Sequence, residues 1–254
     1  MTDFESNEKP NQIEGRKPVW EALKAGRPVD KLIIQNTAQN ESIKGIIGLA
    51  RRSGILVDYV PKERIAAIAQ TQNHQGVIAV LSAAGYIELD DMIDSAFRQT
   101  DSPMFAVLDE VQDPHNLGAV IRSAECLGAS GVVITKRRSA SLTAAAAKAS
   151  AGATEHLPVA RVENLRNALT KMKERGIWVI GADSEGRDIA EIDMTGPTAI
   201  VLGNEGTGIR PLVRTECDQL AAIPMRGRIG SLNVSVAAGI FLYEASRRRK
   251  PRNA

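Results

Sequence analysis

The chain has 254 residues, of which 43% are hydrophobic and 24% charged, and its formal net charge is +2. These are ordinary globular values, with enough chain for one large or two modest domains. The only cysteines, Cys126 and Cys217, and three scattered histidines suit neither a disulfide framework nor a metal site. No apolar run is long enough to span a bilayer, and the acidic first ten residues do not resemble a signal peptide. We therefore expect a cytoplasmic protein with no membrane partner and no metal.

The first part of the chain predicts a small α/β domain. Residues 1–11 are polar and are expected to be disordered. Between residues 12 and 83, helical and strand periodicities alternate. The predicted helices cover 15–26, 41–54 and 61–69, and the predicted strands cover 31–35, 55–60 and 75–81. Residues 84–102 are polar and acidic, with a helical stretch at 92–97, and are expected to form an interdomain linker.

The second part, residues 103–249, alternates strand and helix to its end. Its predicted strands cover 105–108, 131–135, 157–160, 178–182, 198–202 and 220–223. Its predicted helices cover 117–128, 142–152, 162–175, 210–217 and 233–249. This alternation predicts a mainly parallel sheet that is covered on both faces. Residues 250–254 continue a basic stretch that begins at Arg247 and suits either phosphate neutralisation or a frayed terminus.

Three strand–loop–helix stretches carry the chemistry. In the first, Asp113-Pro-His-Asn116 precedes a helix, with Asn116 expected at its N-cap. Arg122 lies off the apolar stripe of that helix, where a solvated arginine is the ordinary interpretation. In the second, the strand 198–202 runs into a glycine-rich loop containing Glu205, whose spacing is not the dinucleotide fingerprint.

The third stretch links the strand that ends at Ile223 to the last helix. Its loop carries Arg226 and Arg228, and Ser231 and Asn233 are natural caps for the helix that follows. A polar loop that feeds a capped helix points backbone N–H groups at a ligand, although a turn that merely packs is equally consistent with the spacing.

Together, the three stretches resemble the SpoU, or TrmH-like, branch of the SPOUT trefoil-knot RNA methyltransferases. The matching signatures are Asp113-Pro-His-Asn116-x5-Arg122, Leu202-Gly-Asn-Glu205-Gly-x-Gly-Ile209 and Ile223-Pro-Met…Ser231-Leu-Asn233-Val-Ser-Val-Ala-Ala238. They occur in order and at family-like separations across residues 103–249. The resemblance implies a C-terminal trefoil knot and a homodimer built on the last helix and the helix of the first stretch.

The resemblance also implies a cofactor and site residues. S-adenosylmethionine would be the methyl donor, bound by Leu202, Gly203, Asn204, Gly208, Ile223, Met225 and Leu232. The catalytic set would be Arg122, Glu205, Asn116, Asn233 and Ser231. The family proposal makes the arginine the base that accepts the ribose proton, but a guanidinium loses its proton only above about pH 12. Orientation of the hydroxyl and stabilisation of the alkoxide are the alternative. Glu205 would hold Arg122 by a charge-assisted hydrogen bond, which works against the arginine as a base, and the choice stays open.

The front domain is similar to the L30e-like RNA-binding domain of bacterial guanosine-2′-O-methyltransferases of 23S ribosomal RNA. That similarity covers Ile13-Glu-Gly-Arg-Lys-Pro-Val-Trp-Glu-Ala-Leu23 and Asn73-His74-Gln75-Gly76-Val77, and it implies RNA contacts at Arg16 and His74. Arg226 and Arg228 are further RNA candidates because they flank the implied site.

Other functions remain to be weighed. A transfer RNA substrate, an adenosine methylation of the antibiotic-resistance type, and a non-catalytic RNA-binding assembly factor are the alternatives. A nucleotide-linked oxidoreductase is disfavoured because the dinucleotide fingerprint is absent.

Overall fold

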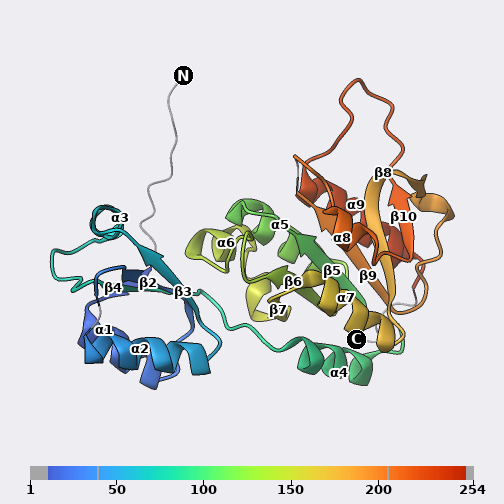
Figure 1. The fold of residues 1–254 in the computed structure, drawn as a ribbon. Helices are drawn as coiled ribbons and strands as arrows, with labels where there is room; N and C mark the ends of the chain where they lie inside the picture. Colours follow the sequence, from blue (N-terminus) through green and yellow to red (C-terminus); the bar gives the residue numbers. More distant parts are fainter. Residues whose placement is uncertain (1–10, 39, 205, 250–254) are drawn as a thin grey trace. The chain divides into compact units, whose positions relative to one another are not determined.

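The computed structural model describes residues 11–38, 40–204 and 206–249, which form two compact units (Figure 1). The first unit runs to Gly85 and includes Ser141–Ala145. The second comprises Tyr86–Ala140 and the chain from Ala146 onward. The amphipathic patterns of the sequence account for both units, and each is described by itself below.

The first unit is a four-stranded mixed sheet with helices on both faces. Its strands are β1 (Gln12–Glu14), β2 (Val29–Gln35), β3 (Leu56–Val60) and β4 (Val77–Leu81), in the order β1-β4-β2-β3. Its helices are α1 (Arg16–Lys24), α2 (Glu41–Arg52) and α3 (Lys62–Ile68). The strands β2 and β3 are parallel, and β4 runs antiparallel to both of its neighbours.

Two apolar clusters cover the two faces of this sheet. On one face α1 and α2 pack on alternate residues of β2 and β4, including Leu32 and Ala79. On the other face Ile65 of α3 packs against Ile33 and Ile78. The alternation of buried residues to both faces is why β4 reads as a continuous apolar run.

The second unit is a six-stranded parallel sheet. Its strands are β5 (Met104–Asp109), β6 (Gly131–Thr135), β7 (Val159–Val162), β8 (Trp178–Asp188), β9 (Thr198–Gly203) and β10 (Gln219–Ala222), in the order β10-β8-β9-β5-β6-β7. Every neighbouring pair is parallel. From β5 the chain adds β6 and β7 on one side of the sheet, and it then places β8, β9 and β10 on the other side. The carboxyl edge between β5 and β9 is therefore the place where an open parallel sheet offers a ligand crevice.

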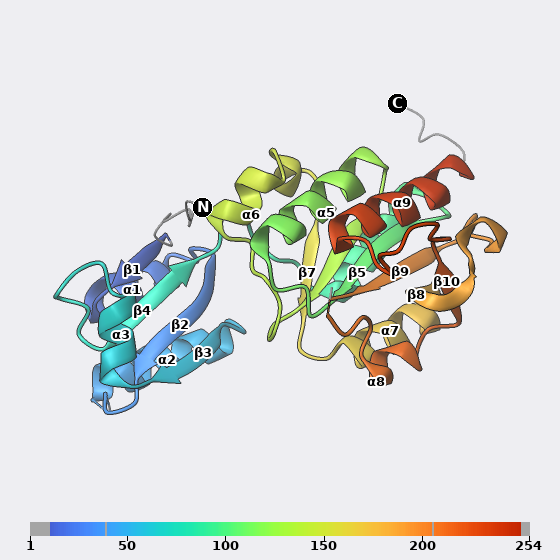
Figure 2. The same ribbon diagram turned by 90° about the horizontal axis from the view of Figure 1, so that it is seen from above.

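Helices cover both faces of the second sheet, and two short 3-10 turns follow Gly152 and Asp188. The helices are α4 (Leu89–Gln99), α5 (Pro114–Cys126), α6 (Ala144–Ala149), α7 (Leu165–Glu174), α8 (Pro211–Arg214) and α9 (Val234–Arg247). Figure 2 shows α5 and α9 side by side on one face and α7 and α8 on the other. The core on the second of these faces joins α4, α7 and α8 to Phe105 and Val107 of β5.

The predicted α/β architecture is confirmed, with differences at several element ends. The first helix of the second sheet begins at Pro114 rather than at residue 117, because the Asp113 carboxylate accepts the backbone N–H of His115 and caps it. Asn116 therefore lies inside the first turn, and its prediction as the N-cap was wrong. β1 was missed because three residues carry too little periodicity.

Most of the stretch expected to be a linker is helix α4. Its apolar residues recur at helical spacing and are buried in the core of the second unit, among them Met92 and Ile93, which are fully buried. Gly131 leaves room for Met92, since a Cβ on that glycine would lie 2.3 Å from the Met92 sulfur. The acidic residues that suggested a linker lie on the solvent face of this helix.

The arginines that begin the basic C-terminal stretch make internal contacts. Arg247 and Arg248 both pair with Glu244, and the Arg249 guanidinium donates to the carbonyls of Ser102, Met194 and Gly196 at 2.8–3.0 Å. Burial lowers the pKa of Arg249 to about 10. These three side chains thus fasten the end of the chain, while residues 250–254 lie outside the described part.

Among the described residues, none of the helices is long and apolar enough to cross a membrane. The trefoil knot that the family resemblance implies stays a prediction.

We expect Met92→Ala to lower the free energy of unfolding by about 2–5 kcal/mol, the usual range for emptying a filled core site. Chemical denaturation measures this change, and Arg98→Ala, at an exposed site on the same helix, is the matched control. Equal stability of the two variants would show that α4 is a loosely attached connection.

Candidate active site

A hollow of about 670 Å³ opens beside the ends of β8, β9 and β10 and the start of α9. All seven residues predicted to hold the donor line it: Leu202, Gly203, Asn204, Gly208, Ile223, Met225 and Leu232. Ser231, from the predicted catalytic set, lines it as well. The second and third predicted stretches therefore converge on one cavity, although β8 separates β9 from β10 in the sheet.

The glycine-rich loop after β9 folds tightly back on itself. A Cβ on Gly203 would lie 2.0 Å from the carbonyl carbon of Gly208, so no other residue fits at this position. The Asn204 side-chain oxygen accepts the backbone N–H groups of Gly206 and Thr207 at 2.9 and 2.8 Å. Asn204 thus shapes the loop that borders the cavity, in addition to lining it.

The loop before α9 supplies the exposed apolar part of the wall. Met225 is 40% exposed and Leu232 is 36% exposed, and both line the cavity together with Ile223. Arg226 and Arg228 lie in the same loop and are exposed, as is expected of RNA contacts. Apolar side chains that remain open to solvent on a cavity wall are suited to cover an aromatic ring of a ligand.

A hydrogen bond joins the first and third stretches. The Asn233 amide donates to the Asn116 side-chain oxygen at 3.0 Å, while the Asn233 oxygen accepts the backbone N–H of Ser235 at 2.9 Å and caps α9. Asn233 therefore acts both as a cap and as a link between the N-terminal turns of α5 and α9. The contact brings together two residues of the predicted catalytic set, Asn116 and Asn233.

The structure places Arg122 outside the cavity. Its side chain is exposed on α5, and it has no ion pair or hydrogen bond to another described residue. Glu205, its predicted partner, lies outside the described residues. The pairing of Arg122 with Glu205 accordingly stays a prediction.

An ion-pair group on the cavity wall was missed by sequence reasoning. Arg214 of α8 donates to Asp183 and Glu185, which follow the buried part of β8, at 2.8 Å each. Burial opposes ionisation of Asp183, but the backbone N–H of Glu185 and the Arg214 guanidinium together lower its pKa. The position of Asp183 just past a predicted parallel strand was the available signal, because ligands gather at such ends.

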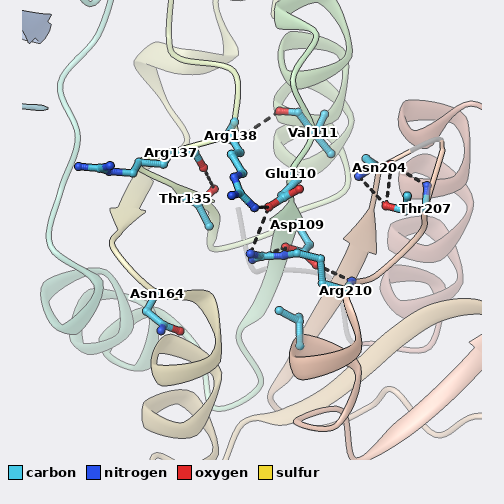
Figure 3. Close-up of polar contacts among 12 residues, drawn as sticks. Asp109, Glu110, Val111, Thr135, Arg137, Arg138, Asn164, Asn204, Thr207 and Arg210 are labelled. Atoms are coloured by element: carbon cyan, nitrogen blue, oxygen red, sulfur yellow. Dashed lines mark hydrogen bonds and ion pairs between the residues drawn. The ribbon is translucent and has the colours of Figure 1, made fainter. Parts of the chain in front are cut away.

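A second charged group joins the loops after β5, β6 and β9 (Figure 3). The carboxylate of Asp109 is fully buried and accepts the backbone N–H of Arg210 at 2.8 Å and its Nε at 2.7 Å. Arg210 also reaches Glu110 at 3.1 Å, and Glu110 in turn lies 3.4 Å from Arg138. The hydrogen bond with Asp109 raises the pKa of Arg210, so the guanidinium stays charged.

The first unit has a polar hollow of its own, of about 630 Å³. Arg16 and His74, both predicted to contact RNA, line it together with several side-chain amides. The Arg16 Nε donates to the Gln75 carbonyl at 3.2 Å, and the His74 Nδ1 accepts the backbone N–H of Gly76 at 3.1 Å. No group of three potential metal-ligating side chains occurs in the described part of the chain.

Residues 103–243 match the SpoU rRNA methylase family. The chain belongs to this family. Residues 12–87 match a second model, for the substrate-binding domain of RNA 2′-O ribose methyltransferases. YacO of Bacillus subtilis, named as a TrmH family tRNA/rRNA methyltransferase, is 46% identical over 241 residues, which are 94% of this chain and 96% of that protein.

Solved structures of SpoU methyltransferases share the fold. AviRb from Streptomyces viridochromogenes is 26% identical, with a TM-score of 0.60 over 96% of this chain and 91% of that one. An AdoMet-bound rRNA methyltransferase from Sinorhizobium meliloti is 28% identical, with a TM-score of 0.58 over 95% and 88% of the two chains. The protein is thus an RNA ribose methyltransferase of the SpoU family, as its three sequence signatures predicted.

We expect Gly203→Ala to weaken S-adenosylmethionine binding at least tenfold, because its Cβ would displace the backbone at Gly208 and with it the cavity wall. Isothermal titration calorimetry measures the affinity. Gly206→Ala is the matched control in the same loop, since the nearest atom to its Cβ would be 3.5 Å away. Equal donor affinity in the two variants would separate this loop from donor binding.

Proposed function

We infer that the protein methylates the 2′-hydroxyl of a ribose in ribosomal RNA, with a guanosine of the 23S molecule as the expected target. The observation that carries this proposal is the convergence of all seven predicted donor contacts on one cavity. The front domain supports an RNA substrate, because it matches a substrate-binding domain of RNA 2′-O ribose methyltransferases and brings Arg16 and His74 to one polar hollow. Ribosomal rather than transfer RNA is the expected class because the front domain resembles that of the 23S ribosomal RNA enzymes.

S-adenosylmethionine is the methyl donor, and the residues around the cavity fit it. Exposed apolar side chains at Met225 and Leu232 suit the adenine ring. Gly203 has no side chain, so the donor could approach the backbone closely at that position. The donor's amino-acid end carries both an ammonium and a carboxylate, and the Asp183–Arg214 pair on the wall offers a charge of each sign. When bound, the donor supplies an electrophilic methyl group.

Around that donor, this chain's polar side chains would position the ribose. Asn116 and Asn233 are joined by a hydrogen bond and present amide groups beside the start of α9. Arg122, which is exposed on α5, would orient the hydroxyl and stabilise the developing alkoxide; a role as the base would require loss of a proton that guanidinium holds strongly.

A homodimer is part of this proposal. Val236, Ile240 and Tyr243 recur at helical spacing on α9 and are 50%, 36% and 58% exposed, which leaves an apolar stripe beside α5. A second copy of the chain would cover this stripe and the neighbouring face of α5, which carries Arg122.

The proposed reaction predicts the loss of one ribose methylation in cells without the gene. Mass-spectrometric mapping of ribosomal and transfer RNA would identify the nucleotide, and the wild-type gene should restore its methylation.

Arg122→Ala should lower methyl transfer at least about 100-fold without changing the folded state, as removal of one electrostatic contact to a reacting oxygen does. Arg98→Ala, which removes an exposed arginine of α4, is the control for the loss of a surface positive charge. A methylation lost only from transfer RNA would overturn the ribosomal assignment, and full activity of Arg122→Ala would remove that arginine from the mechanism.

We expect Tyr243→Lys to shift the protein from dimer to monomer, because it replaces the most exposed residue of the apolar stripe with a charge. Sedimentation velocity measures the oligomeric state, and Lys62→Glu in the first unit is a charge-change control. A monomeric wild-type protein at micromolar concentration would contradict the proposed dimer.

A further inference from the structure

An arginine beyond the predicted RNA contacts lies at the carboxyl edge of the second sheet. Arg138 follows β6, and its guanidinium points toward Glu110, which follows β5 (Figure 3). Neither residue lines the donor cavity. The loop from Glu110 to Asp113 leads directly into α5, which carries Asn116 and Arg122.

Glu110 does not need Arg138 as a partner. Its carboxylate lies 3.1 Å from the Arg210 guanidinium, and its side chain is only 13% exposed. Arg210 is held from its other side by buried Asp109, through both its backbone and its side chain. The two acids and Arg210 therefore form a connected group that would remain paired if Arg138 left it.

Arg138 adds little to the fold by this contact. Its side chain is 73% exposed and its closest approach to Glu110 is 3.4 Å, and such exposed ion pairs contribute little to stability. Arg137 beside it is also exposed, and its guanidinium has no partner among the described residues. Arg138 thus lies next to an acid that is already neutralised by Arg210, while the Arg137 side chain points away from that acid (Figure 3).

The backbone nevertheless holds this arginine in an uncommon conformation. Arg138 and Glu110 have φ values of +56° and +59°, in the left-handed region that side chains other than glycine rarely adopt. The two loops are fastened together, since the Ala140 N–H donates to the Val111 carbonyl at 2.8 Å and the Ser139 hydroxyl donates to the same oxygen at 3.3 Å. Strain of this kind persists where the surroundings impose it and is concentrated at functional sites.

We propose that Arg138 binds a backbone phosphate of the substrate RNA and leaves Glu110 to Arg210 when the RNA docks. Guanidinium binds phosphate through two parallel, charge-assisted hydrogen bonds, which an exposed contact to one carboxylate oxygen does not match. The proposal rests on the proposed function, because it takes RNA to be the substrate. It adds a contact on the catalytic unit to those expected from the front domain.

The test measures the affinity of unmodified, transcribed large-subunit ribosomal RNA for the full-length protein as a function of KCl concentration. Each phosphate contact contributes about 0.7–0.9 to the magnitude of the slope of log K against log salt, so one contact changes affinity by about five- to eightfold between 0.1 M and 1 M. Arg138→Gln should lose one such contact, and Arg138→Lys should retain the slope because it keeps the charge.

Arg187→Gln is the matched control, since Arg187 is 60% exposed and lies 3.3 Å from Glu191 in an equally open ion pair. Donor affinity and the melting temperature should be unchanged in all three variants. If Arg138→Gln and Arg187→Gln have the same salt slope as the wild type, the phosphate contact is refuted while the proposed function stands. If the wild type binds this RNA without salt dependence, the proposed function fails as well.

Discussion

The buried carboxylate of Asp109 is the contact on which the geometry of the second unit depends. It ends β5 and receives both the backbone and the side chain of Arg210, which follows the loop of the neighbouring strand β9. A buried carboxylate is stable only when it is paired and hydrogen-bonded, so this contact holds the two loops in one arrangement. One loop leads to the donor cavity and the other to α5.

The cavity and the polar link between helices serve different parts of the proposed reaction. The close-approach backbone at Gly203 and apolar side chains such as Leu232 line the cavity, where they would form a wall for the donor. The Asn116–Asn233 hydrogen bond joins the N-terminal turns of α5 and α9 and so fixes where polar groups meet that wall. Because each group is held by the fold itself, little reorganisation is needed when substrates bind.

The contacts of individual arginines say more about RNA binding than the net charge of the molecule does. A net charge of +2 would not predict RNA binding. The arginines that begin the basic C-terminal stretch contact Glu244 and backbone carbonyls, and a phosphate-binding role of this stretch stays a prediction. Exposed arginines in loops, such as Arg226 and Arg228, are better placed, because they are not committed to internal carbonyls or acids.

Local periodicity determined the α/β class, nearly every helix and strand, and the three loops that hold the predicted site residues, since burial of one face imposes a repeat that the chain displays directly. The tertiary structure alone decided that α4 packs into the core, that Asp183 and Arg214 line the cavity, and that Glu110 lies opposite Arg138. Those pairings join residues that are distant along the chain. No local spacing encodes them, because they depend on which strands become neighbours in the sheet.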